Sequence, residues 1–118
     1  MFLIEIFYDL LSLASANTVF YLDPPYRPVS CTSSFVDYTA KGFSDLDQIR
    51  LSEFCNKIDS LGSYFILSNS DPQELSPEDS FLLDLYGKFN VRRVRAPRNI
   101  NCVSSKRGKV SELIISNF

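Results

Sequence analysis

The sequence contains no histidine and no tryptophan, and it has only four glycines and three cysteines among its 118 residues. The lack of histidine excludes nucleophile triads with an imidazole base and every zinc site that needs imidazole ligands. The cysteines are widely spaced, odd in number and without a Cys-x-x-Cys pair, so we expect no disulfide framework and a cytoplasmic location. What is present, a 45% apolar fraction, is typical of one globular domain.

Charge is divided unevenly along the chain. Residues 1–84 hold four basic and thirteen acidic side chains, whereas residues 85–118 hold eight basic and one acidic. The basic residues of the second segment are Lys88, Arg92, Arg93, Arg95, Arg98, Lys106, Arg107 and Lys109. Such a stretch is a candidate phosphate-binding surface. Charge alone leaves open the alternative of a solvated loop and strand face.

The segment 1–17 is apolar and contains an Ala-Ser-Ala run, as a signal peptide would. No basic residue precedes the apolar stretch, and Glu5 and Asp9 interrupt it, so we expect neither a signal peptide nor a membrane span. The apolar residues on or near one face predict a packing helix: Leu3, Ile6, Phe7, Leu10, Leu11 and Leu13. We expect a soluble protein with no membrane partner.

The remaining chain alternates between strand and helix patterns. Short β-branched and aromatic runs predict strands at 18–22, 63–68, 91–95 and 110–116. One helix is predicted over 45–61, with Ser44 as its N-cap and Gly62 at its end. A second helix is predicted over 77–86, with Ser76 as its N-cap and a proline in the first helical position.

This order of elements predicts an α/β fold. Right-handed crossovers place the first strands in parallel, and the short last connection predicts an antiparallel hairpin. Ligands of such sheets bind beyond the carboxyl ends of the strands. The polar runs Asp23–Tyr26 and Asn69–Pro72 stand there, and the first leads into a long polar loop over 27–43. The sequence therefore predicts the functional site at this edge of the sheet.

The run Asp23-Pro24-Pro25-Tyr26 is the most informative part of the sequence. Two prolines fix φ and remove two backbone donors, so the chain leaves the strand rigidly. Carbonyl oxygens here can accept hydrogen bonds from a ligand, and Tyr26 offers a flat face for a planar ring. The run predicts a site that accepts hydrogen bonds from an amino group on a stacked ring. The alternative is a strand-ending turn capped by Asp23.

Asp-Pro-Pro-Tyr after an apolar strand resembles the motif of the amino-group DNA methyltransferases, which use S-adenosylmethionine. Four segments resemble the carboxyl half of Dam-type adenine-N6 DNA methyltransferases: Phe20 to Tyr38, Asp47 to Cys55, Phe65 to Asp71 and Val91 to Asn117. The resemblance makes residues 18–118 the carboxyl-terminal half of a class I methyltransferase catalytic domain and leaves residues 1–17 unmatched. It implies a partial Rossmann-like sheet of mostly parallel strands with a terminal antiparallel hairpin.

The resemblance also implies roles for single residues. Asp23 and the carbonyl of Pro24 accept hydrogen bonds from the adenine amino group and contact the cofactor, and Tyr26 stacks on the base. The substrate, double-stranded DNA with a flipped adenine, is contacted by Pro25, Arg27, Asn99, Lys106 and Arg107. Unstacking that base costs on the order of a few kcal/mol. Methyl transfer to an exocyclic nitrogen requires alignment rather than a metal or a protein nucleophile.

Two parts of the family pattern are absent from the sequence: the amino-terminal Phe-x-Gly-x-Gly cofactor loop and the target-recognition domain. We therefore expect a truncated fragment that binds S-adenosylmethionine weakly or not at all by itself. Strand 18–22 is expected to present an unpaired edge, through which the chain self-associates or recruits its missing amino-terminal half. Alternatives are a non-catalytic nucleic-acid-binding remnant and a methyltransferase for RNA or protein amides. Asp23 counts against protein amides, because those family members usually have Asn there.

Overall fold

The computed structural model of the chain describes residues 10–28, 42–98 and 108–118. Within these residues the elements are η1 (Leu10–Leu13), β1 (Val19–Leu22), α3 (Asp45–Ser60), β2 (Tyr64–Ser70), η2 (Pro72–Glu74), α4 (Phe81–Tyr86), β3 (Asn90–Arg98) and β4 (Gly108–Ser116). The four predicted strands are all present, and β2, β3 and β4 are longer than their apolar runs indicated.

The strands form one sheet in the order β1-β2-β4-β3. The pair β1–β2 is parallel, whereas β2–β4 and β3–β4 are antiparallel. The predicted antiparallel hairpin is therefore confirmed. The expectation of mostly parallel strands is not confirmed. β4 lies between β2 and β3 and forms an antiparallel pair with each of them. Among the described residues the fold is a mixed α/β arrangement with a single parallel pair.

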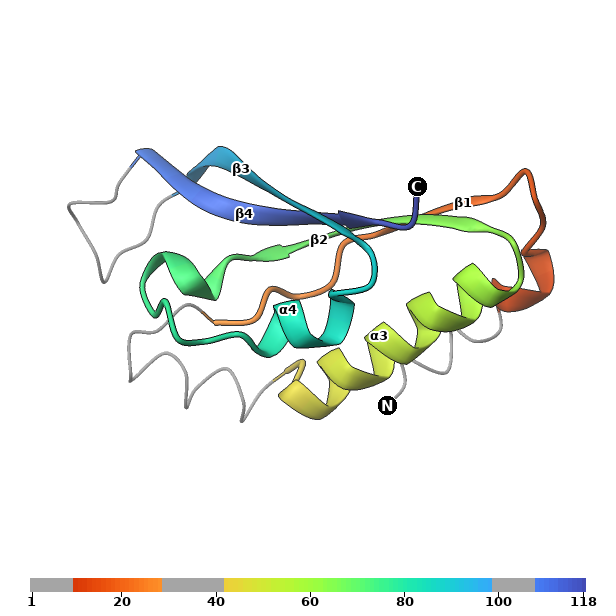
Figure 1. Cartoon of the computed structure of the whole chain (residues 1–118), viewed down its shortest axis with the longest axis horizontal. Coiled ribbons are helices and arrows are strands. Elements are labelled where there is room, and N and C mark those ends of the chain that lie inside the picture. Colours follow the sequence, from red (N-terminus) through yellow and green to blue (C-terminus); the bar gives the residue numbers. More distant parts are fainter. Residues whose placement is uncertain (1–9, 29–41, 99–107) are drawn as a thin grey trace.

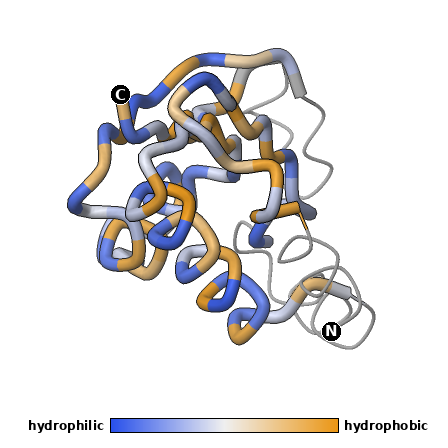
Figure 2. The backbone as a smooth tube through the Cα atoms, turned by 90° about the vertical axis from the view of Figure 1, so that its right-hand side faces the viewer, coloured by the Kyte–Doolittle hydropathy of each residue, from blue (hydrophilic) through white to orange (hydrophobic). Residues whose placement is uncertain are grey.

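Both α-helices cover the same face of the sheet (Figure 1). On β1, Phe20 and Leu22 face the helices and are buried, while Val19 and Tyr21 are 55% and 71% exposed on the opposite face. In the described part of the chain β1 is paired with one neighbour, β2, and the expectation of an unpaired strand edge stays a prediction. Hydrophobic and hydrophilic residues alternate along the elements, as expected for a sheet with one covered face (Figure 2).

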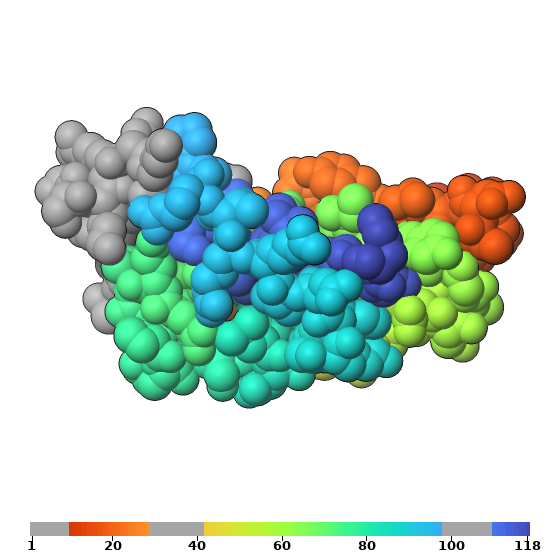
Figure 3. Space-filling view, turned by 45° about the horizontal axis from the view of Figure 1, so that its top comes forward, coloured from red at the N-terminus to blue at the C-terminus, as the bar shows by residue number. Residues whose placement is uncertain are grey.

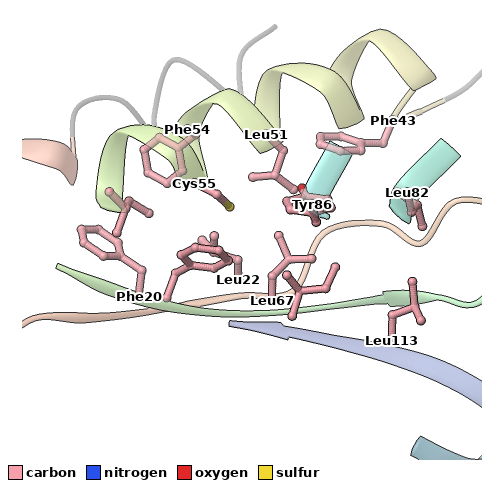
Figure 4. Packing of buried hydrophobic residues seen from close by; sticks show 13 residues of the cluster. Phe20, Leu22, Phe43, Leu51, Phe54, Cys55, Leu67, Leu82, Tyr86 and Leu113 are labelled. Atoms are coloured by element: carbon pink, nitrogen blue, oxygen red, sulfur yellow. The ribbon is translucent and has the colours of Figure 1, made fainter. Parts of the chain in front are cut away.

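The hydrophobic core lies between α3 and the sheet (Figure 4). Leu51 and Phe54 of α3 point toward Phe20 and Leu67 of the strands, and all four side chains are buried. The rings of Phe20 and Phe54 meet edge to face, with centroids 6.1 Å apart. Burial of side chains of this size contributes about 1.5–3 kcal/mol each. The core therefore holds α3 firmly against the strands whose ends carry the candidate site.

The predicted limits of α3 are confirmed. Ser44 and Asp47 form a capping box, in which each side chain bonds the other residue's backbone N–H. The helix ends where Gly62 adopts a φ of +81°, a left-handed conformation that favours glycine. The prediction for α4 was too long, because the helix begins at Phe81 instead of Pro77. Asp79 explains the later start, since its side chain bonds both the Phe81 N–H and Arg27.

Only the end of the predicted N-terminal helix lies within the described residues. Leu10–Leu13 forms a 3-10 turn there, and Leu11 and Ala14 pack against the core. The predicted positions Leu3, Ile6 and Phe7 lie outside the described residues. In the part of the chain that the structure describes, no helix has the length and apolar character needed to cross a membrane.

Candidate functional site at the carboxyl ends of β1 and β2

The loop of residues 23–27, which we call the acceptor loop, begins where β1 ends. Leu22 pairs with Leu67 in the β1–β2 ladder, and this register brings Asp23 beside Ser68. The Ser68 hydroxyl donates a hydrogen bond to Asp23 Oδ1 at 3.0 Å. Asp23 is exposed and the next residue, Pro24, is buried. The strand register therefore holds the Asp23 carboxylate at the sheet edge, where a ligand can reach it.

Two contacts from distant elements hold the middle of the acceptor loop. Gln48 of α3 donates from Nε2 to the carbonyl oxygen of Pro25 at 3.2 Å. The hydroxyl of Tyr26 donates to Glu112 Oε1 of β4 at 3.2 Å. Since Tyr26 is half-buried and Glu112 is buried, this bond restrains the orientation of the tyrosine ring.

Asn69 of β2 joins the acceptor loop to the second predicted polar run. Its Oδ1 accepts from the Arg27 and Ser70 backbone N–H groups at 3.0 and 2.8 Å. Its Nδ2 donates to Gln48 Oε1 at 3.1 Å, and the Ser70 hydroxyl donates to the Arg27 carbonyl at 2.5 Å. Asn69 and Gln48 are both fully buried. The prediction that Asp23–Tyr26 and Asn69–Pro72 lie together is therefore confirmed.

Arg27 is fixed by two acidic residues of the helical side. Its guanidinium pairs with Asp45 at 2.9 Å and with Asp79 at 2.7 Å, and its side chain is 10% exposed. The guanidinium also lies 4.5 Å from the centroid of the Phe81 ring. Burial by itself lowers the pKa of Arg27, but the bonds and charges of the two carboxylates outweigh it and raise that pKa. In this structure Arg27 braces the loop; its predicted contact with DNA stays a prediction.

A count of hydrogen bonds shows which acceptors of the loop are available. Asp23 Oδ1, the Pro25 carbonyl and the Arg27 carbonyl all accept bonds within the protein. Among the described residues, Asp23 Oδ2 and the Pro24 carbonyl have no partner. These two groups belong to the residues for which the sequence analysis expected contacts with an amino group. The protein thus supplies partners to part of the loop and leaves acceptors at Asp23 and Pro24, among them Asp23 Oδ2 and the Pro24 carbonyl.

The basic stretch is partly neutralised by acids from the acidic segment 1–84. Arg93 pairs with Asp71 at 2.8 Å, and Arg95 pairs with Glu74. Figure 3 shows β3, in light blue, lying over the green segment that contains η2. The predicted DNA-contacting residues Asn99, Lys106 and Arg107 lie outside the described residues. Two of the positive charges in the basic segment are therefore paired with negative charges from the acidic segment.

A surface pocket of about 430 Å³ lies at these ion pairs rather than at the acceptor loop. It is lined by Asp71, Gln73, Glu74, Pro77, Arg93, Arg95 and Ser111. Its two carboxylates pair with its two guanidinium groups, and the Ser111 hydroxyl donates to Asp71 at 2.7 Å. The charges of the lining balance, so the pocket by itself does not select an anionic ligand.

Sequence reasoning missed two residues that hold the site and assigned no such role to a third. Gln48 and Glu112 were not singled out, and Asn69 was noted only as part of a polar run. Gln48 lies three residues before Leu51 on the apolar stripe of α3, and a polar residue in that position indicates a buried hydrogen bond. Glu112 is similarly the lone acid among residues 85–118, the basic segment of the sequence.

Comparison with known proteins identifies a family whose model matches most of the chain. The family model of the D12 class N6 adenine-specific DNA methyltransferases matches residues 5–100. The match begins within the segment for which the sequence analysis expected no resemblance, and it includes the whole acceptor loop. Where the methyltransferase part of the chain begins stays a prediction.

Several curated relatives are similar over most of this chain. The type II methyltransferase M1.LlaDCHI of Lactococcus lactis subsp. cremoris is 43% identical over 83% of the chain and 32% of its own length. The type II methyltransferase M.MjaIII of Methanocaldococcus jannaschii is 43% identical over 87% of the chain and 34% of its length. A DNA adenine methylase of Salmonella typhi is 31% identical over 96% of the chain and 38% of its own length. The chain spans about a third of the length of these relatives, and it belongs to the D12 class N6 adenine-specific DNA methyltransferase family.

Proposed function

We propose that the acceptor loop binds the amino group of a DNA adenine and that the chain is part of an enzyme that methylates adenine N6. The observation that carries this proposal is the pair of available acceptors, Asp23 Oδ2 and the Pro24 carbonyl, on a loop in which Asp23 Oδ1, the Pro25 carbonyl and the Arg27 carbonyl already accept bonds within the protein. An exocyclic amino group has two N–H donors, which match two acceptors. Membership of the family supports the same substrate.

The chemistry proposed for these residues is orientation and polarisation. Asp23 and Pro24 accept the two N–H bonds of the adenine amino group, which directs the nitrogen lone pair away from the loop and raises its nucleophilicity. S-adenosylmethionine would supply the methyl group: an N–CH3 bond would form as the S–CH3 bond of the sulfonium breaks to leave a neutral thioether, and the proton released from the nitrogen would pass to solvent water. No protein nucleophile takes part. Asp23 and Pro24 are also the proposed contacts of the chain with this cofactor.

The proposed DNA contacts surround the acceptor loop. The Tyr26 ring stacks on the flipped base, and the hydroxyl bond to Glu112 holds the ring in place before the base arrives. Pro25 is exposed beside it. Asn99, Lys106 and Arg107, between β3 and β4, are proposed to contact phosphates. Because Arg93 and Arg95 are already paired with carboxylates, phosphate binding is assigned to the loop rather than to the strand.

The proposed wider context follows from the partial match to the relatives. The four-stranded sheet is proposed to be part of a class I, Rossmann-like methyltransferase sheet, with β1 as the edge that meets the remainder of the enzyme. We propose that this edge contacts the amino-terminal half of the enzyme or a second copy of the chain. Cys55, a free and buried thiol, is compatible with the cytoplasm as the proposed location.

The experiment is a chimera in which this chain replaces the matching segment of the Lactococcus lactis relative. We expect the chimera to transfer methyl groups from S-adenosylmethionine to adenine N6 in duplex DNA, measured by mass spectrometry of the nucleosides. Asp23→Ala is expected to reduce the rate at least a thousandfold, because the amino group loses its charged acceptor. Asp84→Ala, an exposed carboxylate on α4, is the matched control and is expected to keep the rate.

Two results would count against the proposal. A folded chimera that methylates cytosine instead of adenine would contradict the substrate. A chimera that methylates adenine equally well with Asp23→Ala would contradict the assignment of the acceptor loop, and the alternative of a nucleic-acid-binding remnant would then be favoured.

A further inference from the structure

Gln48 and Asn69 form a chain of side-chain amides that ends on the acceptor loop. Asn69 Nδ2 donates to Gln48 Oε1 at 3.1 Å, and Gln48 Nε2 donates to the Pro25 carbonyl at 3.2 Å. At the other end, Asn69 Oδ1 accepts the Arg27 N–H at 3.0 Å. The two side chains therefore bond the backbone of the acceptor loop on both sides of Tyr26. We call these two residues the amide pair.

The position of the amide pair makes it a rigid support. Gln48 lies on α3 and Asn69 lies on β2, and both are fully buried, so neither can exchange its loop partner for water. A buried amide that loses its hydrogen-bond partner is costly, which fixes the direction in which each amide points. The amide of Gln48 fits this place because one side chain must supply an acceptor to Asn69 and a donor to Pro25, and Oε1 and Nε2 do so with two separate atoms.

We infer that Gln48 and Asn69 are positioning residues for adenine recognition, acting through the backbone of the acceptor loop. By holding the Pro25 carbonyl and the Arg27 N–H, they leave the Pro24 carbonyl and Asp23 Oδ2 as the acceptors for the amino group. Neither residue touches the base. The inference rests on the proposed function only for the identity of the ligand; the fixing of the loop is a property of the chain itself.

The first test measures the loop in the full chain. Gln48→Met keeps the length of the side chain and removes both hydrogen bonds, and Gln73→Met makes the same change outside the amide pair. Hydrogen exchange followed by NMR is expected to show that Gln48→Met accelerates exchange of the Arg27 N–H at least about tenfold, with the β2 amides unchanged. Gln73→Met is expected to leave the Arg27 N–H unchanged. An unchanged Arg27 N–H in Gln48→Met, or equal acceleration of all amides, would overturn the inference.

A measurement on the unmodified chain covers the case in which Gln48→Met does not fold. The Nε2 protons of Gln48 are expected to exchange with solvent at least about tenfold more slowly than those of Gln73. Equal exchange rates for the two glutamines would overturn the inference.

The second test separates the inference from the proposed function. In the chimera, Gln48→Met is expected to lower kcat for adenine methylation at least about tenfold and to change KM for DNA less than about twofold. A change in KM alone would overturn a positioning role. If Gln48→Met loosens the loop but the unsubstituted chimera methylates no adenine, the amide pair keeps its role in fixing the loop and the proposed function fails.

Discussion

The acceptor loop and the basic strand β3 both carry conspicuous polar residues, but these residues differ in how the surrounding protein contacts them. Buried amides and a carboxylate hold the acceptor loop from three elements and leave two acceptors available. On β3, the guanidinium groups of Arg93 and Arg95 pair with acids near η2 and remain about half exposed, with side-chain exposures of 49% and 56%. The acceptor loop is therefore held by buried partners and keeps acceptors available for the proposed ligand, whereas the guanidinium groups of Arg93 and Arg95 are used in ion pairs within the protein.

The comparison predicts that the largest loss of stability follows removal of Arg27. Arg27→Ala leaves Asp45 and Asp79 without their shared partner, and we expect the free energy of unfolding to fall by about 2–3 kcal/mol in urea titrations. Arg27→Lys keeps the charge without the planar guanidinium fork that bonds both acids, and an intermediate loss is expected. A loss below about 0.5 kcal/mol for Arg27→Ala would show that the loop is not braced in this way.

DNA affinity gives the next largest contrast. If the loop between β3 and β4 contacts phosphates, Lys106→Ala with Arg107→Ala reduces the slope of log affinity against log salt by about 2, equally for all duplex sequences. Arg93→Ala with Arg95→Ala is expected to change that slope by less than about 1, because both guanidinium groups are paired. Fluorescence anisotropy between 50 and 200 mM salt measures both. The opposite ranking would contradict the assignment of phosphate binding.

The Tyr26–Glu112 bond is expected to have a smaller effect. Tyr26→Phe removes one hydroxyl donor to a buried carboxylate, which costs about 1–2 kcal/mol of unfolding free energy. A double-mutant cycle with Glu112→Ala, which removes the acceptor, is expected to give a coupling of about 1 kcal/mol. Additive losses, with no coupling, would mean that Glu112 does not fix the tyrosine.

The smallest stability effects are expected on β3. Arg93→Ala and Arg95→Ala are each predicted to lower the unfolding free energy by about 1 kcal/mol, because the nearly buried carboxylates of Asp71 and Glu74 lose a cation but keep their bonds from Ser111. Arg92→Ala, on the same strand and without an ion pair among the described residues, is the control. If a β3 variant lowered the unfolding free energy about as much as Arg27→Ala, the proposed difference between the acceptor loop and β3 would be contradicted.

Sequence reasoning succeeded where the information was local. The cap at Ser44, the end of α3 at Gly62 and the hairpin of β3 and β4 each depend on a few neighbouring residues, and all three were predicted. The motif at Asp23 likewise predicted the edge of the sheet at which the polar groups gather.

The predictions that failed depend on contacts between distant residues. The start of α4 is displaced because Asp79 bonds Arg27, which is 52 residues away in sequence. The insertion of β4 between β2 and β3 is a choice of strand partner that alternating hydrophobicity does not encode. The neutralisation of Arg93 by Asp71 likewise requires knowledge of which strand lies against η2.

The most direct test of the account is whether the acceptor loop discriminates an amino group from its dimethylated form. NMR titration of the chain with 2′-deoxyadenosine is expected to shift resonances of Asp23 and its neighbours up to Arg27. N6,N6-dimethyl-2′-deoxyadenosine, which has no N–H to donate, is expected to leave them unchanged, and Asp23→Ala is expected to abolish the response to 2′-deoxyadenosine. Equal shifts with both nucleosides, or shifts confined to residues outside the acceptor loop, would contradict the account.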